Sequence, residues 1–128
     1  MRILGIDYGQ RKIGLALATS KIAEPLGVIK YLNWKSFVIR LIKILTEEKI
    51  EKIVIGISEA KSGRETRTFG EKLAKEISLP VEYFDETLST QEAQKLSREA
   101  GIGCKKRTTL EDAYAAAVIL QNCLDLKL

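Results

Sequence analysis

The chain has 128 residues, of which 45% are hydrophobic and 30% are charged, with a formal net charge of +4. This length fits one domain over residues 1–128, and the small positive charge favours a polyanionic partner only weakly. There is no histidine, which excludes Ser-His-Asp and Cys-His catalysis, HExxH zinc sites and hydrolysis by a histidine acid or base.

The N-terminal part of the chain predicts three strands. An apolar run at residues 2–7 is typical of a buried strand, and the turn residues after it return the chain as a second strand over residues 12–19. Residues 26–32 predict a third strand. Because only a few residues separate the first two strands, we expect them to form a hairpin.

Helices and strands alternate in the rest of the chain. Asn33 is expected to cap a helix over residues 34–49, in which apolar residues recur at helical spacing. The other predicted elements are a strand over 52–57, a helix over 65–78, a strand over 81–85, a helix over 89–100 opened by a Ser89–Glu92 capping box, and a last helix over about 110–124. This order predicts an α/β protein: a three-layer α/β/α domain with a mixed five-stranded sheet whose first three strands are antiparallel.

The cysteines and the apolar runs indicate the compartment. Cys104 and Cys123 have no CxxC spacing, so thiols in a reducing cytosol are favoured over one disulfide, which stays an alternative. No stretch approaches the roughly 20 apolar residues that cross a bilayer, and charged residues interrupt the first 20 positions. We expect a cytoplasmic protein with no membrane segment.

Three acidic positions are candidates for chemistry. Asp7 ends the first strand, Asp85 and Glu86 end the short fifth strand, and Glu111 with Asp112 opens the last predicted helix. Each has an ordinary structural interpretation: a turn residue at Asp7, a loop before a cap at Asp85 and Glu86, and a capping box formed by Thr108 and Glu111. Taken singly, none of them indicates a function.

The combination of the three is more informative. Ala115 and Ala116 lie one turn beyond Asp112, and small residues there would let the helix pack closely on the sheet. Asp112 would then lie near the strand ends that carry the other acids. Carboxylate and water oxygens are the ligands that Mg²⁺ and Mn²⁺ prefer.

Three blocks of the sequence resemble the signature blocks of the YqgF/RuvX family, in the same order and over nearly the whole chain. They are Gly5-Ile6-Asp7-Tyr8-Gly9 with Arg11-Lys12-Ile13-Gly14, then Asp85-Glu86-Thr87-Leu88-Ser89-Thr90, then Asp112-Ala113-Tyr114-Ala115-Ala116. Members of this family have an RNase H-like fold and are described as Holliday junction resolvases and as pre-16S rRNA nucleases. The resemblance therefore implies a nuclease domain of this fold.

The resemblance implies a role for each acid. Asp7, Glu86 and Asp112 would form a catalytic triad that binds two Mg²⁺ or Mn²⁺ ions, with Asp7 bridging them, and Asp85 would be a neighbour outside the triad. The reaction would be in-line hydrolysis of a phosphodiester to a 5′-phosphate and a 3′-hydroxyl, with the metal ions replacing a histidine base.

Two departures from the family pattern concern the substrate and leave the acids in place. Thr87 stands where the family usually has Arg, and Gly56-Ile57-Ser58 replaces the usual Gly-Leu-Pro. A hydroxyl does not replace a guanidinium that faces a phosphate, so we expect an altered substrate preference.

Basic residues flank two of the proposed metal ligands. Arg11 and Lys12 lie in the hairpin beside Asp7, and Lys105, Lys106 and Arg107 lie in a predicted loop before the Asp112 helix. We expect both groups to contact phosphates of a nucleic acid.

The remaining candidates are weaker. Arg64 and Arg67 are equally compatible with phosphate contact and with ordinary solvated surface charge. Among the aromatic residues, Tyr8 is the candidate for substrate contact, whereas Trp34 is expected to pack.

Two other functions remain open at this point. The Asp-x-Gly-x-x-x-x-Gly hairpin also resembles the phosphate loop of actin-like ATPases, but these need two lobes and 128 residues provide one. A non-catalytic nucleic-acid-binding module is the other alternative, and intact acids argue against it.

Either structured RNA or branched DNA would suit the site, with the family resemblance favouring the 5′ end of pre-16S rRNA. The oligomeric state stays open, and a dimer would suit symmetric cutting of a junction.

Overall fold

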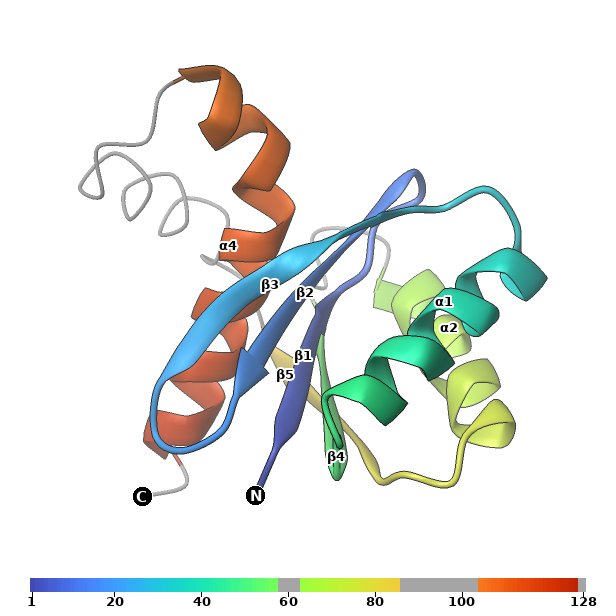
Figure 1. Ribbon diagram of the computed structural model, residues 1–128. Coiled ribbons are helices and arrows are strands. Elements are labelled where there is room, and N and C mark those ends of the chain that lie inside the picture. Colours follow the sequence, from blue (N-terminus) through green and yellow to red (C-terminus); the bar gives the residue numbers. More distant parts are fainter. Residues whose placement is uncertain (58–62, 86–103, 127–128) are drawn as a thin grey trace.

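The computed structural model describes residues 1–57, 63–85 and 104–126, with the backbone alone at residue 85 and residues 104–110. Over these ranges the chain forms five strands and three helices (Figure 1). They are β1 (Ile3–Asp7), β2 (Lys12–Ala18), β3 (Ala23–Lys30), α1 (Trp34–Glu47), β4 (Lys52–Ile57), α2 (Gly63–Glu76), β5 (Val81–Asp85) and α4 (Cys104–Leu126).

The strands form one mixed sheet in the order β3-β2-β1-β4-β5. β1 pairs antiparallel with β2, and β2 pairs antiparallel with β3, whereas β4 is parallel to both β1 and β5. The predicted mixed sheet with an antiparallel first half is therefore confirmed. Because β1, β4 and β5 run in the same direction, their carboxyl ends lie at the same edge of the sheet.

Helices cover both faces of this sheet, which makes the predicted three layers (Figure 1). α1 and α2 lie on one face, and α4 crosses the other. Side chains alternate between the faces along each strand. In β1, Leu4 and Ile6 belong to the cluster that contains α1 and α2 residues, while Gly5 contacts α4.

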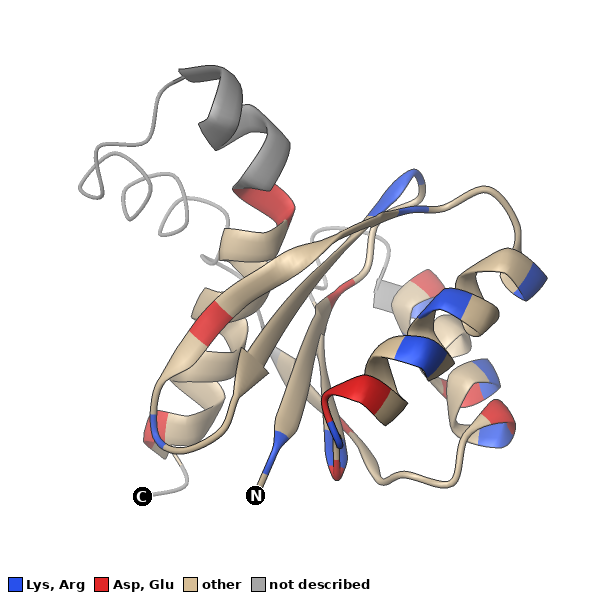
Figure 2. Cartoon of the chain, viewed as in Figure 1, with Lys and Arg blue, Asp and Glu red and all other residues tan. Residues whose placement is uncertain are grey.

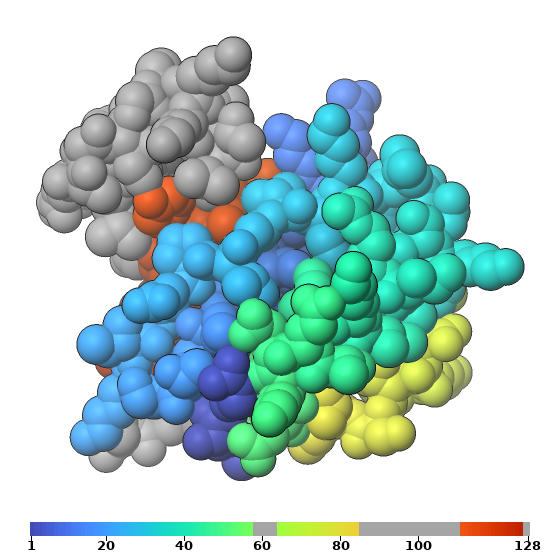
Figure 3. All heavy atoms as spheres, viewed as in Figure 1, coloured from blue at the N-terminus to red at the C-terminus, as the bar shows by residue number. Residues whose placement is uncertain are grey.

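The two faces bury side chains of different size. The cluster under α1 and α2 consists of large residues, and the cluster under α4 consists mainly of small ones. The first contains Leu4, Ile6, Ile13, Leu15, Ile29, Phe37, Val38, Leu41, Leu45, Ile50, Ile53, Ile55, Phe69 and Leu73, and the second contains Ala16, Ala18, Val54, Ala116, Ala117, Leu120 and Cys123. In the space-filling view, α1 covers much of the visible face beside the strands (Figure 3).

The start of α1 follows the prediction. Asn33 is the N-cap, and its side-chain oxygen accepts a hydrogen bond from the Ser36 amide at 2.8 Å. At the other end, Arg2 forms an ion pair with Glu48 at 3.1 Å and so joins β1 to the end of the helix.

The third strand begins earlier than predicted, at Ala23 instead of Leu26. The additional residues include Pro25, which is tolerated because β3 is an edge strand. Leu15 pairs with Gly27 and Ala16 pairs with Pro25, so the register shifts at this point and Leu26 is skipped.

The last helix also begins earlier than predicted, at Cys104 instead of Leu110. The predicted capping box of Thr108 and Glu111 is therefore wrong, and Lys105 to Arg107 lie in helical backbone instead of a loop. Three cations near a helix N-terminus oppose the helix dipole, which favoured the loop prediction, but Lys and Arg are strong helix formers. The helix predicted over 89–100 lies outside the described residues.

The helical backbone also decides between thiols and a disulfide. Cys104 and Cys123 lie in the same helix, α4, with Cys123 buried. A rise of 1.5 Å per residue separates their positions by about 28 Å along the axis, far beyond disulfide range. Among the described residues, no helix is both long and apolar enough to cross a bilayer.

Candidate active site

Asp7 lies at the carboxyl end of β1, and glycines flank it on both neighbouring strands. Asp7 pairs with Gly14 of β2 and with Gly56 of β4, and it is half-buried. Neither neighbour has a side chain that could cover the carboxylate or pair with it. Asp7 thus lies at the edge of the sheet where α/β proteins bind their ligands.

Gly14 brings α4 into backbone contact with the sheet beside Asp7. A Cβ atom at position 14 would lie 1.9 Å from the carbonyl oxygen of Asp112, closer than any two such atoms can approach. Only glycine fits at this position without displacing the helix. Asp112, in the third acidic block of the prediction, is thus held next to β2, and β2 pairs with β1 at Asp7.

Gly5 extends the same contact along α4. A Cβ atom there would lie 3.0 Å from Cβ of Leu120 and 3.2 Å from the carbonyl oxygen of Ala116. The predicted close packing of the helix is confirmed for Ala116, which is fully buried against the sheet. Ala115 is buried as well, but in a separate cluster with Val118.

The environment of Asp112 differs from the prediction in one respect. Because α4 begins at Cys104, Asp112 lies more than two turns inside the helix. The helix dipole acts mainly on the first turn, so it does little to stabilise the negative charge of the Asp112 carboxylate. Asp112 is half-buried, with Ala113 fully buried beside it.

The third predicted acid follows β5. Asp85 is the last residue of this strand and pairs with Ile57 of β4. Glu86 and Thr87 lie outside the described residues, and within the described ranges no three acidic or cysteine side chains are grouped as a metal site would need. The structure thus brings together Asp7 and Asp112 and places the end of β5 at the same edge of the sheet.

The donor chemistry at this edge fits a hard divalent cation. Asp7 and Asp112 both carry carboxylate oxygens, and the contact of Gly14 with Asp112 brings their two segments together at this edge. Oxygen ligands at an open position are those that Mg²⁺ and Mn²⁺ prefer.

Basic residues gather at the β1–β2 turn, where blue segments lie together in Figure 2. Arg11 and Lys12 are exposed, and Lys12 pairs directly with Lys30 of β3. Like charges on opposite strands repel one another, and a bound anion would relieve that repulsion. Lys105, Lys106 and Arg107 lie in the first turn of α4 by their backbone.

The sequence interpretation missed Gly56 and Lys30. Gly56 had a detectable signal, since an isolated glycine in a β-branched strand marks a close approach of another group. Lys30 had none, because its pairing with Lys12 depends on the register of two strands.

Tyr8 does not share the face of Asp7. As the next residue along the chain, its ring points to the other side, where it packs on Phe69 with ring centroids 4.5 Å apart. Burial raises the pKa of the Tyr8 phenol, and the nearby Glu65 and Tyr31 raise it further. Tyr8 thus packs against the residues of the α1 and α2 face, whereas Asp112 belongs to α4 on the other face.

The two arginines of α2, Arg64 and Arg67, have different neighbours. The guanidinium of Arg67 stacks over the ring of Tyr83 at 5.4 Å, while Arg64 borders a cavity with Tyr8. Burial raises the pKa of Tyr83, Glu71 raises it further, and Arg67 opposes the rise.

A mixed sheet in this order, with helices on both faces, an acid at the end of β1 and another on a helix packed against β2, is an RNase H-like fold. The sequence matches the family described as "RuvX: Holliday junction resolvase" over residues 1–126. The chain therefore belongs to the RuvX family, as its three sequence blocks predicted.

Curated relatives match over nearly their whole length. One from Anaeromyxobacter sp. (strain Fw109-5), named "Putative pre-16S rRNA nuclease", is 41% identical over 133 aligned residues, which cover 98% of this chain and 97% of the relative. A relative of the same name from Dictyoglomus thermophilum is 35% identical, and the alignment covers 98% of this chain and 96% of the relative.

Solved structures of resolvases share the fold. The chain matches Thermus thermophilus RuvC in complex with a Holliday junction substrate with a TM-score of 0.59 and 18% identity, over 99% of this chain and 95% of that one. It matches the fowlpox virus Holliday junction resolvase with a TM-score of 0.63 and 17% identity, over the full length of both.

Proposed function

We propose that this protein is a metal-dependent endonuclease of the cytoplasm that hydrolyses phosphodiester bonds at the 5′ end of pre-16S rRNA. The whole chain, residues 1–128, would act as one nuclease domain. The observation that carries the proposal is the contact of Gly14 with the backbone of Asp112, because Gly14 is also the strand partner of Asp7. Two acids from opposite ends of the sequence are thereby held at one strand end.

Three acids would form the metal site. Asp7 and Asp112 are two of them, and Glu86, which directly follows the last residue of β5, is the third. Two Mg²⁺ or Mn²⁺ ions bound there would supply a nucleophilic water at neutral pH and stabilise the leaving oxygen. Asp7, on the central strand β1, would be a ligand of both ions.

The remaining steps rest on the chain's own side chains. No histidine is present to take a proton, so the carboxylates would act by holding the metal ions that activate the water. Arg11 and Lys12 would bind substrate phosphates on one side of Asp7. Lys105, Lys106 and Arg107 would do so on the other side, since Lys105 lies seven residues before Asp112, about 10 Å along the helix axis.

Cleavage of four-way DNA is the second candidate function. The family description names a Holliday junction resolvase, and the solved structures with this fold include a resolvase bound to a junction. A resolvase cuts two strands symmetrically, so this function would require a dimer.

A cleavage panel tests these proposals. Precursor rRNA with its 5′ leader, unstructured single-stranded RNA and four-way DNA junctions are incubated with the protein and Mg²⁺ or Mn²⁺. We expect cleavage of the precursor, and Asp7→Asn or Asp112→Asn to slow it at least about a hundredfold, because losing a metal ligand removes several kcal/mol of transition-state stabilisation.

Asp125→Asn is the matched control, since this acid is exposed near the far end of α4 and its carboxylate accepts a hydrogen bond from Gln121. It should cleave as the wild type does. Junction cleavage without precursor cleavage would favour the resolvase. Binding of either substrate without cleavage by the wild type would favour a non-catalytic module.

A further inference from the structure

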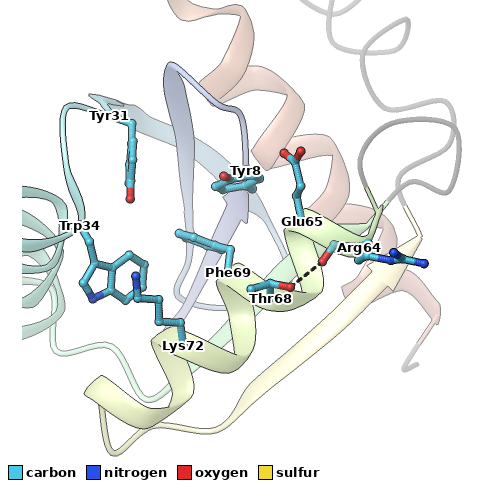
Figure 4. Close-up of a pocket in the computed structure, with 8 residues that line it drawn as sticks. All are labelled: Tyr8, Tyr31, Trp34, Arg64, Glu65, Thr68, Phe69 and Lys72. Atoms are coloured by element: carbon cyan, nitrogen blue, oxygen red, sulfur yellow. Dashed lines mark hydrogen bonds between the residues drawn. The ribbon is translucent and has the colours of Figure 1, made fainter.

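A cavity of about 330 Å³ opens at the end of β1, on the sheet face opposite Asp7. Figure 4 shows its lining side chains, which come from the β1–β2 turn, the β3–α1 connection, the start of α1 and α2. They are Tyr8, Tyr31, Trp34, Arg64, Glu65, Thr68, Phe69 and Lys72. A volume at the lower end of the range for ligand sites fits one small planar group.

Four aromatic rings form most of the walls. Tyr8 packs on Phe69 at 4.5 Å, and Trp34 meets Phe69 edge-on at 5.9 Å. Tyr31 packs on Phe37 of the core at 5.9 Å, so its ring is supported from behind. In Figure 4 the rings of Tyr31 and Tyr8 stand on different sides of the space above Phe69.

Polar groups are few and lie at the edges. The Lys72 ammonium lies 4.5 Å from the ring of Trp34, and the Glu65 carboxylate accepts a hydrogen bond from the Gln10 amide at 3.1 Å. The hydroxyl of Thr68 donates to the carbonyl of Arg64 at 3.0 Å, and the Arg64 side chain points away from the cavity (Figure 4).

The cavity adjoins the basic turn of the candidate active site. The amide of Tyr31 donates to the carbonyl of Arg11 at 2.8 Å, which joins the cavity wall to the β1–β2 turn. Lys30, the residue before Tyr31, is paired with Lys12. A strand of nucleic acid whose phosphates follow this basic turn would pass the mouth of the cavity.

We propose that this cavity binds one unpaired base of a single-stranded segment of the nucleic-acid substrate. The inference rests on the proposed function for the nature of the substrate. The faces of Tyr31 and Tyr8 suit a base by stacking, which every base allows through its π-face. Lys72 is placed to meet a base edge or a phosphate, and Glu65 is placed to accept a hydrogen bond from a base amino group.

The single tryptophan allows a direct test, because Trp34 lines the cavity and reports on its occupation. RNA hexamers, single-stranded or annealed to a complement, are titrated into the protein in EDTA while Trp34 fluorescence is followed. We expect the single-stranded hexamer to change the fluorescence saturably and the duplex to change it much less.

Two pairs of variants locate the binding. Stacking energies predict that Tyr31→Ala weakens hexamer binding about tenfold, whereas Tyr31→Phe, which keeps the ring, stays within twofold. Lys72→Ala should reduce the slope of log K against log salt by about 0.7, the value for one phosphate contact of a single strand. Lys75→Ala is its control, as an exposed residue of the same helix that does not line the cavity.

Hexamer binding that leaves Trp34 fluorescence unchanged would overturn the proposal, as would equal affinity for Tyr31→Ala and wild type in folded protein. The proposed function can fail separately. If the protein binds the hexamer through these residues but cleaves no substrate, the base site stands and the proposed nuclease function fails. If the protein cleaves substrate and the Tyr31 and Lys72 variants bind the hexamer like the wild type, the nuclease function stands and the base site fails.

Discussion

The two faces of the sheet are built from side chains of opposite size. The face under α1 and α2 carries Leu, Ile and Phe, and the face under α4 carries mainly Gly and Ala on β1 and β2, with Val54 on β4. Large side chains keep a helix at the usual packing distance and supply most of the hydrophobic free energy of folding. Glycine removes that spacing, so the α4 backbone meets β1 and β2 directly.

This difference divides stability and chemistry between the two faces. At the α4 face, small residues bury little area but set the position of Asp112 relative to Asp7. At the other face, Leu41 of α1 and Leu73 of α2 are fully buried in the cluster of large residues. We therefore expect substitutions on one face to change stability and substitutions on the other to change activity.

Leu41→Ala tests the large-residue face and has the largest expected effect on stability. Removing a fully buried leucine leaves a cavity and should lower the free energy of unfolding by about 3 kcal/mol, measured by urea denaturation. Ile39→Ala in the same helix, where the side chain is 62% exposed, should cost less than about 0.5 kcal/mol. Cleavage per folded molecule should be unchanged in both, and a loss of activity in Leu41→Ala would break the division.

Gly14→Ala tests the small-residue face. Its Cβ atom would overlap the Asp112 carbonyl, so α4 must shift, and we expect a loss of about 2 kcal/mol together with at least about a tenfold loss of cleavage. Gly27→Ala is the control, because no atom lies within 4 Å of a Cβ there. Gly14→Ala protein that folds and cleaves like the Gly27→Ala protein would show that close packing does not position Asp112.

Tyr83→Phe tests a smaller effect, on the α1 and α2 face. Because the folded state raises the pKa of Tyr83, it favours the protonated phenol, and this contribution is present below pH 10 and lost as the pH rises through the folded pKa. We expect Tm to fall between pH 9 and pH 11, and to fall less in Tyr83→Phe. An identical fall in both proteins would assign the alkaline loss to other groups.

Local patterns were sufficient to predict most of the sheet and two helices. β4 has its predicted bounds because Lys52–Ile57 is rich in β-branched residues, and α1 begins where Asn33 offers a cap. The start of α4 could not be predicted in the same way. Thr108 and Glu111 matched a capping box, whereas the helix had already begun at Cys104.

The site was predictable as a set of residues, and its assembly was not. Asp7, Glu86 and Asp112 could be named from their sequence blocks, yet the contact of Gly14 with Asp112 joins segments from opposite ends of the chain. The contact of Gly14 with α4 depends on tertiary packing, which a local sequence pattern does not reveal. The aromatic cavity was missed for the same reason, since Tyr8, Tyr31 and Phe69 come from separate elements.

Binding of Mn²⁺ in a double-mutant cycle tests the central claim, that Asp7 and Asp112 form one metal site. Calorimetric titrations compare the wild type, Asp7→Asn, Asp112→Asn and the double variant, with Asp125→Asn as the control. If the two acids share a site, each single variant should weaken Mn²⁺ binding about as much as the double variant does, and Asp125→Asn should bind like the wild type. Wild-type affinity in Asp112→Asn, or losses that simply add, would contradict the claim.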